Sequence, residues 1–266
     1  MIKKIYKFEN GVMYCGDTLI VMDKIIKRGD KVNLVLTSPP YNTQRNLSDR
    51  TYDIYQDGIC NNKYIEWTLE IFERYEKILE ENGTILYNLS YGNENPSIMF
   101  EVLYKIINKT EFMIADIITW KKKSAMPNNM SHNKLTRITE YVFVICRKKE
   151  YLTFKTNRKV SSVGKTGQKV YKIAYNYIEA KNNDKTTKLN KSTYSTELCD
   201  KLFDEYLIDG DRCLDNFSGT GTTLVSANRR NCKFIGIELS EEQCEYAKER
   251  IENDIKRGIS LHGLAW

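Results

Sequence analysis

The sequence predicts an α/β fold built on a mostly parallel, twisted sheet. Short apolar segments alternate with amphipathic ones in the first half of the chain, and the same alternation returns after about residue 197. Such alternation is typical of sheets whose strands run parallel. Two predicted strands, 32–36 and 212–215, lead directly into turns rich in proline or glycine. Open α/β sheets bind their ligands beyond such strand ends, so both turns are candidate parts of a site.

The first half of the chain contains one long helix and several strands. Residues 32–36 (VNLVL) are predicted to form a buried strand. A helix that stops before Gly83 is predicted by apolar residues on one face: Ile65, Leu69, Phe72, Tyr75 and Leu79. The other predicted elements are a strand, a helix and two antiparallel strands, at 84–87, 97–108, 113–120 and 141–147.

The last third of the chain returns to regular alternation. We predict a helix, a strand, a helix and a strand at 197–207, 212–215, 221–230 and 234–237. Ser240 with Gln243 resembles a capping box that opens a final helix. Residues 151–195 have weak periodicity and are interpreted as an inserted module. The chain is thereby divided into a core half (1–150), a module (151–195) and a second core half (196–266).

Composition and length describe an ordinary globular chain. Hydrophobic residues make up 41% of its 266 positions and charged residues 29%, which suffices for one substantial core with a small appended module. No apolar run approaches the roughly 18 residues of a membrane span. The start, MIKKIYKFENG, lacks the apolar region of a signal peptide. We therefore expect a cytoplasmic protein without membrane contact.

The cysteines indicate the same compartment. Seven are scattered along the chain without a CxxC pair, and only two histidines accompany them. This pattern predicts reduced thiols in the core and no metal site.

Basic residues are concentrated in the middle of the chain. Residues 121–149 hold eight basic residues and one acid, and residues 151–191 hold ten basic residues and two acids. Aromatic side chains are interleaved with the second group: Tyr151, Phe154, Tyr171, Tyr175 and Tyr177. This combination suits a polyanion with stackable bases, such as a nucleic acid. The alternative is a solvated basic surface.

The turn after the later strand is a candidate nucleotide site. Residues 213–223 read CLDNFSGTGTT, in which Gly219 and Gly221 let the backbone approach a ligand closely. Asp215 ends the strand and is a candidate to hold an ammonium group. Glu238 ends the next strand, at the spacing from which an acid reaches ribose hydroxyls.

Two rival nucleotide sites compete with this interpretation. A dinucleotide fingerprint lacks its third glycine, because Leu224 stands there. Gly164-Lys165-Thr166 is similar to the end of a phosphate loop, but Lys159 occupies the position of the first glycine. An ATP site is therefore discarded, while a structural tight turn stays open as the alternative.

The other turn is a candidate catalytic loop. Residues 37–42 (TSPPYN) follow a strand, and two consecutive prolines end the strand ladder and stiffen the loop. A rigid loop suits catalytic side chains. The alternative is a proline turn that only ends the strand.

Together these motifs resemble the DNA amino-methyltransferases, whose catalytic signature is (D/N/S)-P-P-(Y/F). Their cofactor motif DxFxGxGTT is matched by Asp215, Phe217, Gly219, Gly221, Thr222 and Thr223. Because the catalytic motif comes first in the chain, the order resembles that of the β group. Gly16-Asp17 is similar to the GD element of that group. Trp120, Lys122 and Glu140 resemble its W-x-K and later Glu.

The resemblance implies a Rossmann-like, S-adenosylmethionine-dependent methyltransferase with a target-recognition module at 151–195. It implies catalytic roles for Ser38, Pro39, Pro40 and Tyr41. It implies cofactor contacts from Asp17, Asp215, Phe217, Gly219, Gly221, Thr222 and Glu238. The implied partner is double-stranded DNA, and a cognate restriction endonuclease and a second copy of the chain are further candidates. Residues 190–197 (NKSTYSTE) depart from the HPTxKP pattern of many relatives, so no contact is transferred to them.

The resemblance also implies a mechanism for transfer to an exocyclic amino group. The Ser38 hydroxyl and the Pro39 carbonyl would accept hydrogen bonds from the amino group. Tyr41 would stack on a base flipped out of the duplex, and Phe217 would face the sulfonium. Serine in the motif favours cytosine N4 over adenine N6. Cytosine C5 chemistry is excluded, because its Pro-Cys nucleophile does not occur in the sequence.

Two further classes of function stay open. An RNA or small-molecule methyltransferase would keep the cofactor motif without needing the basic segment. A non-catalytic DNA-binding protein would keep the basic segment, but the intact Ser38–Tyr41 motif argues against it.

Overall fold

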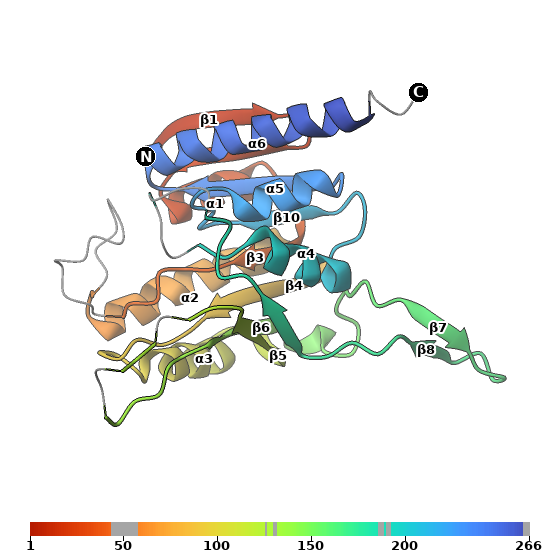
Figure 1. Ribbon diagram of the computed structural model, residues 1–266, viewed down its shortest axis with the longest axis horizontal. Coiled ribbons are helices and arrows are strands. Elements are labelled where there is room, and N and C mark those ends of the chain that lie inside the picture. The colour runs from red at the N-terminus through yellow and green to blue at the C-terminus, as the bar shows by residue number, and fades with distance from the viewer. Residues whose placement is uncertain (44–57, 126, 130–131, 186–188, 190–192, 263–266) are drawn as a thin grey trace.

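The computed structural model describes residues 1–43, 58–125, 127–129, 132–185, 189 and 193–262, the last six of these as backbone only. Nine strands of this part form one sheet: β1 (Ile2–Phe8), β2 (Gly11–Gly16), β3 (Val32–Thr37), β4 (Leu79–Leu89), β5 (Phe112–Lys122), β6 (Thr139–Arg147), β9 (Tyr177–Ala180), β10 (Arg212–Asp215) and β11 (Lys233–Glu238). Their order in space is β1-β2-β11-β10-β3-β4-β6-β5-β9 (Figure 1).

Five neighbouring strands, β2, β11, β10, β3 and β4, run parallel and form the centre of this sheet. β1 pairs antiparallel with β2 at one side, and β6 lies antiparallel between β4 and β5 at the other. β9 closes that side in parallel with β5. The predicted α/β fold with a mostly parallel sheet is confirmed, as is the antiparallel pair in the middle of the chain.

Helices cover both faces of the sheet. The helices among the described residues are α1 (Thr18–Lys27), α2 (Asn61–Ile78), α3 (Ile98–Lys109), α4 (Thr196–Tyr206), α5 (Thr222–Arg229) and α6 (Glu241–His262), with a short 3₁₀ helix at Lys148–Glu150. One core cluster packs α1, α2 and α3 against the sheet, and a second packs α4, α5 and α6 against its other face. The sheet is therefore the middle of three layers.

The central strands read as continuous apolar runs because both of their faces are covered. In β3, Val35 belongs to the first cluster, whereas Leu34 and Leu36 belong to the second. In β4, Ile85 points to the first cluster and Leu86 to the second. Side chains alternate between the faces of a strand, so every position in such a strand meets a hydrophobic layer.

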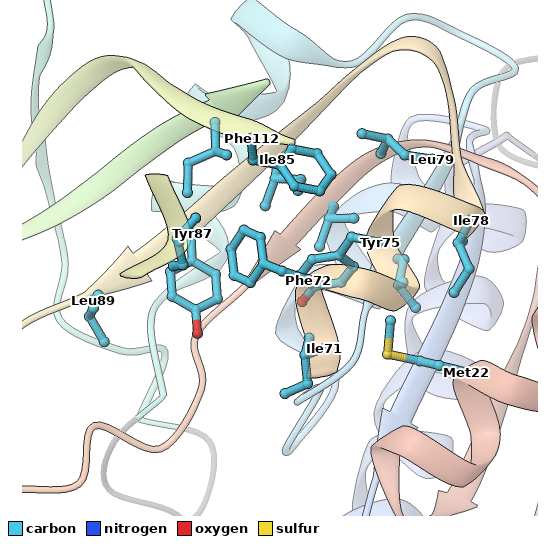
Figure 2. Packing of buried hydrophobic residues seen from close by; sticks show 14 of the residues in the cluster. Met22, Ile71, Phe72, Tyr75, Ile78, Leu79, Ile85, Tyr87, Leu89 and Phe112 are labelled. Carbon is cyan, nitrogen blue, oxygen red and sulfur yellow. The ribbon is translucent and has the colours of Figure 1, made fainter. Parts of the chain in front are cut away.

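Aromatic packing joins α2 to the sheet. Figure 2 shows Phe72 of α2 between the rings of Tyr75, Tyr87 and Phe112. The Phe72 ring centroid lies 5.2 to 5.6 Å from each of them, in edge-to-face geometry. This arrangement is the preferred one for aromatic pairs. All four rings are fully buried, so they anchor α2 on β4 and β5.

The junction of α2 and β4 differs from the prediction. The helix ends at Ile78, and Leu79 already has extended backbone and opens β4. Gly83 therefore lies inside a strand and does not stop the helix. Buried Arg147 explains the abrupt end, because it donates to the backbone carbonyls of Glu76, Leu79 and Glu80 at 2.9 to 3.0 Å. These carbonyls lie at the helix terminus, where intrahelical partners run out.

The N-terminal elements were not predicted. Residues 1–27 form the β1–β2 hairpin and α1, whose N-cap is Asp17. β1 is partly exposed and charged, so it shows little hydrophobic periodicity. At the other end, the start of α6 agrees with the predicted cap, since Ser240 Oγ accepts the Gln243 N–H at 3.3 Å.

The region from 151 to 195 is partly separate from the core. β7 (Val160–Val163) and β8 (Lys169–Tyr171) form a hairpin that projects away from the layered body (Figure 1). β9 is instead part of the main sheet. The structure does not describe Lys188 or the first three residues of 190–197, which include Lys191. A recognition role for this region stays a prediction.

Three further observations concern the composition-based expectations. No helix in the described part of the chain has the length and apolar character needed to cross a membrane. Across the same residues, no group of three or more His, Cys, Asp or Glu is arranged to hold a metal ion. Six of the seven cysteines are buried, and Cys60 is exposed.

Candidate active site

Four parallel strands end beside one another at the side of the sheet that is formed by their carboxyl ends. We call this side the carboxyl edge. Asp17 follows β2, Glu238 ends β11, Asp215 ends β10 and Ser38 follows β3. These strands are consecutive in the sheet, in the order β2-β11-β10-β3. The structure therefore brings the two predicted motifs to one edge, where open α/β sheets carry their sites.

Asp215 joins the two motifs. Its Oδ1 accepts from the Thr37 hydroxyl at 2.8 Å, across 178 residues of sequence, and from the Phe217 N–H at 3.1 Å. Its Oδ2 lies 2.6 Å from the Thr223 hydroxyl and 3.1 Å from the Tyr194 hydroxyl. These two hydroxyls lie 2.6 Å apart, so their two hydrogens supply only two of the three contacts. Burial raises the pKa of this carboxyl, and the hydroxyls of Thr223 and Thr37 oppose that shift. Because both oxygens already accept hydrogen bonds, an ammonium group would share this carboxylate with donors of the chain.

The glycine turn has the backbone that its sequence requires. Gly219 and Gly221 have φ values of 49° and 78°, in the region that favours glycine. At Gly221 a Cβ atom would lie 2.9 Å from the Cβ of Ala247, so α6 packs directly against the turn. The adjacent Thr222 accepts a hydrogen bond from Arg250 of α6 at 2.9 Å, so its hydroxyl is engaged.

Two acids flank the turn. Glu238 Oε2 accepts the Gly219 N–H at 2.9 Å, and Oε1 accepts the Ser240 N–H at 2.8 Å. Burial raises the pKa of Glu238, while these backbone donors lower it. Asp17 ends the neighbouring strand, and its Oδ1 caps α1 by accepting the Ile20 N–H at 3.1 Å.

An aromatic row borders the edge on the side of α2. The Phe217 ring lies 5.4 Å from that of Trp67, and Trp67 lies 5.9 Å from Tyr64. The Tyr64 hydroxyl donates to the Pro40 carbonyl at 2.6 Å. The row thus connects the cofactor motif to the proline loop.

Ser38 and Tyr41 of the proline loop share a hydrogen-bond network. The Tyr41 hydroxyl lies 3.0 Å from Asn88 Oδ1 and 3.1 Å from Glu140 Oε2. Both are acceptors, so the single hydroxyl hydrogen of Tyr41 points to one of them. The 3.0 Å contact between Ser38 Oγ and Tyr41 is then donated by Ser38. Its lone pairs consequently remain available to accept a hydrogen bond from a substrate.

The acceptors of this network are themselves held in place. Asn88 Nδ2 donates to the Tyr141 carbonyl at 3.0 Å, which orients Oδ1 toward Tyr41. Glu140 pairs with Lys122, whose Nζ lies 5.2 Å from the Trp120 ring centroid. Glu140 and Trp120 are directly opposite each other in the β5–β6 ladder. The strand pair therefore brings Trp120, Lys122 and Glu140 to the catalytic loop.

Asn42 anchors the end of the proline loop. It is fully buried and has a φ of 51°. Its Nδ2 donates to the Ile59 carbonyl at 3.0 Å and to Asn61 Oδ1 at 3.2 Å, and its backbone carbonyl accepts from Asn95 at 2.9 Å. Asparagine is one of the few residues that tolerate this conformation while bonding locally. These contacts fix the loop from the side of α2.

Sequence reasoning missed several residues of this edge. Thr37 and Asn88 were not singled out, although Thr37 directly precedes Ser38. Tyr194 lies in the stretch that departs from the HPTxKP pattern, so no resemblance pointed to it. Arg250 stands 28 positions from the threonine it contacts, and nothing local marks it.

Comparisons with known proteins agree with the fold and with the family that the motifs resemble. Residues 32–249 match the N6/N4 methyltransferase family, described as DNA methylase. The chain is 24% identical to the orphan methyltransferase M.BamHII of Bacillus amyloliquefaciens, over 84% of this chain and 90% of that one. It is 23% identical to the type II methyltransferase M.Cfr9I of Citrobacter freundii, over 95% and 93%.

Solved structures share the fold. The PvuII DNA methyltransferase, described as cytosine-N4-specific, superposes with a TM-score of 0.72 at 19% identity, over 97% of this chain and 96% of that one. M1.HpyAVI superposes with a TM-score of 0.62 at 23% identity, over 90% and 97%.

The fold and the matched family define a DNA methyltransferase that depends on S-adenosylmethionine. The chain belongs to the DNA methylase family of N6 and N4 methyltransferases. The described edge fits the cofactor by the chemistry of its groups. Asp17 and Glu238 suit hydroxyl and amino groups, the turn at 219–221 allows close backbone approach, and Phe217 offers an apolar face.

Glu238 provides the cleanest test of the cofactor site. Glu238→Gln keeps one acceptor but turns an amide donor toward the N–H of either Gly219 or Ser240, so one of the two charge-assisted hydrogen bonds at this acid is lost. We expect S-adenosylmethionine to bind about 10-fold more weakly or worse in calorimetric titration. Glu245→Gln on the outer surface of α6 is the matched control and should bind normally. Unchanged affinity in Glu238→Gln would move the cofactor elsewhere.

Proposed function

We propose that this chain transfers the methyl group of S-adenosylmethionine to the exocyclic N4 amine of cytosine in double-stranded DNA. One observation carries the proposal: the Ser38 hydroxyl stands at the carboxyl end of β3 with its hydrogen directed to Tyr41. A neutral hydroxyl acceptor at this position suits an amino group. The cytosine-N4-specific description of the PvuII enzyme supports the N4 amine of cytosine as that amino group.

The catalytic loop would act mainly by positioning. An exocyclic amino nitrogen is a poor nucleophile, because its lone pair is delocalised into the ring. Ser38 Oγ and the Pro39 carbonyl accept hydrogen bonds from its N–H groups and reorient them. The nitrogen lone pair is then less delocalised into the ring. The methylated nitrogen carries a positive charge and is acidic, so a strong base is unnecessary. When bound, the cofactor supplies an electrophilic methyl group on its sulfonium, and the loop aligns the nitrogen with it.

A base inside a duplex must be flipped out to reach this edge. Hydrogen bonds at the Tyr41 hydroxyl hold one end of this side chain and restrict the orientation of its ring. We assign it the stacking role on the flipped base. We also assign the cofactor to Asp17, Asp215, Phe217, Gly219, Gly221, Thr222 and Glu238.

The biological setting is proposed from the relatives. M.Cfr9I is a type II methyltransferase, whereas M.BamHII is an orphan methyltransferase. We propose that this chain modifies DNA in the cytoplasm as the protective part of a restriction–modification system. A partner nuclease and a second copy of the chain belong to this proposal.

The projecting hairpin is the proposed DNA contact. Several basic residues of the middle segment are held in ion pairs within the chain, among them Lys121–Glu179, Lys123–Glu197 and Lys155–Asp211. The hairpin lysines are instead exposed: Lys159, Lys165, Lys169 and Lys172. Exposed aromatic rings follow at Tyr171, Tyr175 and Tyr177. Cations beside exposed rings suit phosphates and bases together.

Salt dependence tests this interface. Because phosphate binding releases counterions, affinity for duplex DNA should fall steeply with added salt. In the double variant Lys165→Gln, Lys169→Gln, the negative slope of log affinity against log salt should become shallower by about 2. Each lysine that neutralises a phosphate contributes about one to its magnitude. Neutralising Lys27 and Lys109, exposed on α1 and α3, is the matched control and should leave the slope unchanged. Equal slopes in both double variants would remove the hairpin from the interface.

The modified base decides the proposed chemistry. Plasmid DNA from a methylation-deficient host is incubated with the enzyme and the cofactor, digested to nucleosides and analysed by mass spectrometry. N4-methyldeoxycytidine is the expected product. N6-methyldeoxyadenosine would instead assign the adenine reaction to the same site. Transfer to RNA alone, or to no nucleic acid, would refute the proposal.

A further inference from the structure

The chain that leads from β9 into α4 is connected to two neighbouring threonines of residues 215–223, which we call the cofactor turn. We call residues 181–185 and 193–195 of this chain the return segment. Tyr194 of this segment contacts the Thr223 hydroxyl at 2.6 Å. The other part of the return segment, 181–185, is connected to the adjacent Thr222 through a side chain of α6. The turn is therefore held from both parts of the segment.

Arg250 makes the second of these connections. Its Nη1 donates to Thr222 Oγ1 at 2.9 Å and to the Thr220 carbonyl at 3.3 Å. Its Nη2 donates to Asp184 in the return segment. The Arg250 and Asp184 side chains are only 13% and 16% exposed, so solvent screens their pair weakly. A planar guanidinium can bridge two sites in this way, whereas an ammonium on a flexible stem cannot match both.

Both ends of this bridge make further contacts within the chain. The two oxygens of Asp184 accept the Thr196 N–H at 3.0 and 3.1 Å, at the start of α4. Ala247, one turn before Arg250 on α6, packs against Gly221 of the turn. The turn and Asp184 are therefore joined through the single guanidinium of Arg250.

We infer that Arg250 is a positioning residue that couples the cofactor turn to the return segment, so that cofactor and duplex DNA strengthen each other's binding. The inference rests on the proposed function, which places the cofactor at residues 215–223 and DNA on the module at 151–195. A ligand that orders one side of the bridge also orders the other. The second ligand then loses less conformational entropy, and the coupling is reciprocal.

Equilibrium dialysis of tritiated S-adenosylhomocysteine measures this coupling, because the compound lacks the transferable methyl group. In the wild-type protein it should bind more tightly with unmethylated plasmid DNA than without. The ratio of the two affinities should fall toward one in Arg250→Lys, and couplings of about 5–150-fold are typical of linked sites. Asp184→Asn should lower the ratio equally. The double variant should lower it no further, since both changes break one bridge.

Arg229→Lys is the matched control, because Arg229 also joins α5 to α6, through Asp254 at 2.6 to 2.8 Å, but does not contact the turn. It should keep the wild-type ratio. A wild-type ratio of one, or an Arg250→Lys ratio equal to the wild type, would overturn the inference while leaving the proposed function intact. A wild-type protein that binds neither the cofactor product nor DNA would refute the proposed function itself. If Arg250→Lys does not fold, Asp184→Asn decides the question alone.

Discussion

Replacing Ser38 by alanine is expected to lower the single-turnover rate of methyl transfer to plasmid DNA by about 10²–10³-fold. Removing one positioned hydrogen-bonding group from an active site commonly costs this much. The reason here is that Ser38 directs its own hydrogen to Tyr41 and offers lone pairs to the substrate amino group. Binding of S-adenosylmethionine, measured by calorimetry, should remain near normal, because Ser38 lies at the end of a different strand from the cofactor motif.

Two further variants make this result specific. Tyr41→Phe keeps the ring that is proposed to stack but removes the hydroxyl that receives the Ser38 hydrogen. It should slow transfer less than Ser38→Ala, since Ser38 can still accept from the substrate. Ser97→Ala, at an exposed position before α3, is the matched control and should leave the rate unchanged. Wild-type rates in Ser38→Ala would refute the catalytic role of the loop and the preference for cytosine N4.

Replacing Arg147 by methionine is expected to destabilise the fold by about 3–5 kcal/mol, the usual cost of leaving buried charges without their partner. Arg147 is 5% exposed. Its Nε donates to Glu76 at 2.8 Å, and Nη1 contacts Glu150 at 3.2 Å. Together with three backbone carbonyls, these contacts engage all five N–H donors of the guanidinium. The change would leave the buried Glu150 carboxylate and the end of α2 without their donor, whereas water can reach the Glu76 carboxylate, which is 35% exposed.

Denaturant unfolding followed by circular dichroism measures this loss as a lower midpoint at an unchanged slope. The matched control is Arg229→Ala, in which a pair with a half-exposed arginine is removed. Such pairs contribute at most about 1 kcal/mol. If Arg147→Met were no more destabilising than this control, the guanidinium would not be what ends α2 at Ile78.

Local patterns predicted element types well where the hydrophobic signal was strong. Buried strands such as 32–36 read as apolar runs, and the long helix showed its face through Phe72 and its neighbours. The β1–β2 hairpin was missed because its outer strand lies at an edge of the sheet and carries exposed charges. Leu79 was assigned to the wrong element because its hydrophobicity suits a helix face and a buried strand equally.

The two motifs were recognised in the sequence, but their meeting depends on strand pairing. β3 pairs with β10, so that Leu34 lies opposite Cys213 and Val35 opposite Leu214. Ser38 and Asp215 are consequently at neighbouring strand ends, although 178 residues separate Asp215 from the Thr37 that contacts it. Nothing in either motif specifies this partner, because a strand's choice of neighbour depends on the packing of both faces.

The sequence by itself determined the α/β class and the membership of the methyltransferase family, and it marked the two motifs whose roles stay predictions. It could do so because periodicity and motif spacing are carried by residues close together in the chain. Only the tertiary structure decided that Ser38 donates to Tyr41, that Arg147 ends α2, and that Arg250 joins the cofactor turn to Asp184. Each depends on buried polar groups that must find partners far away in sequence, and only the assembled layers bring those partners within hydrogen-bond distance.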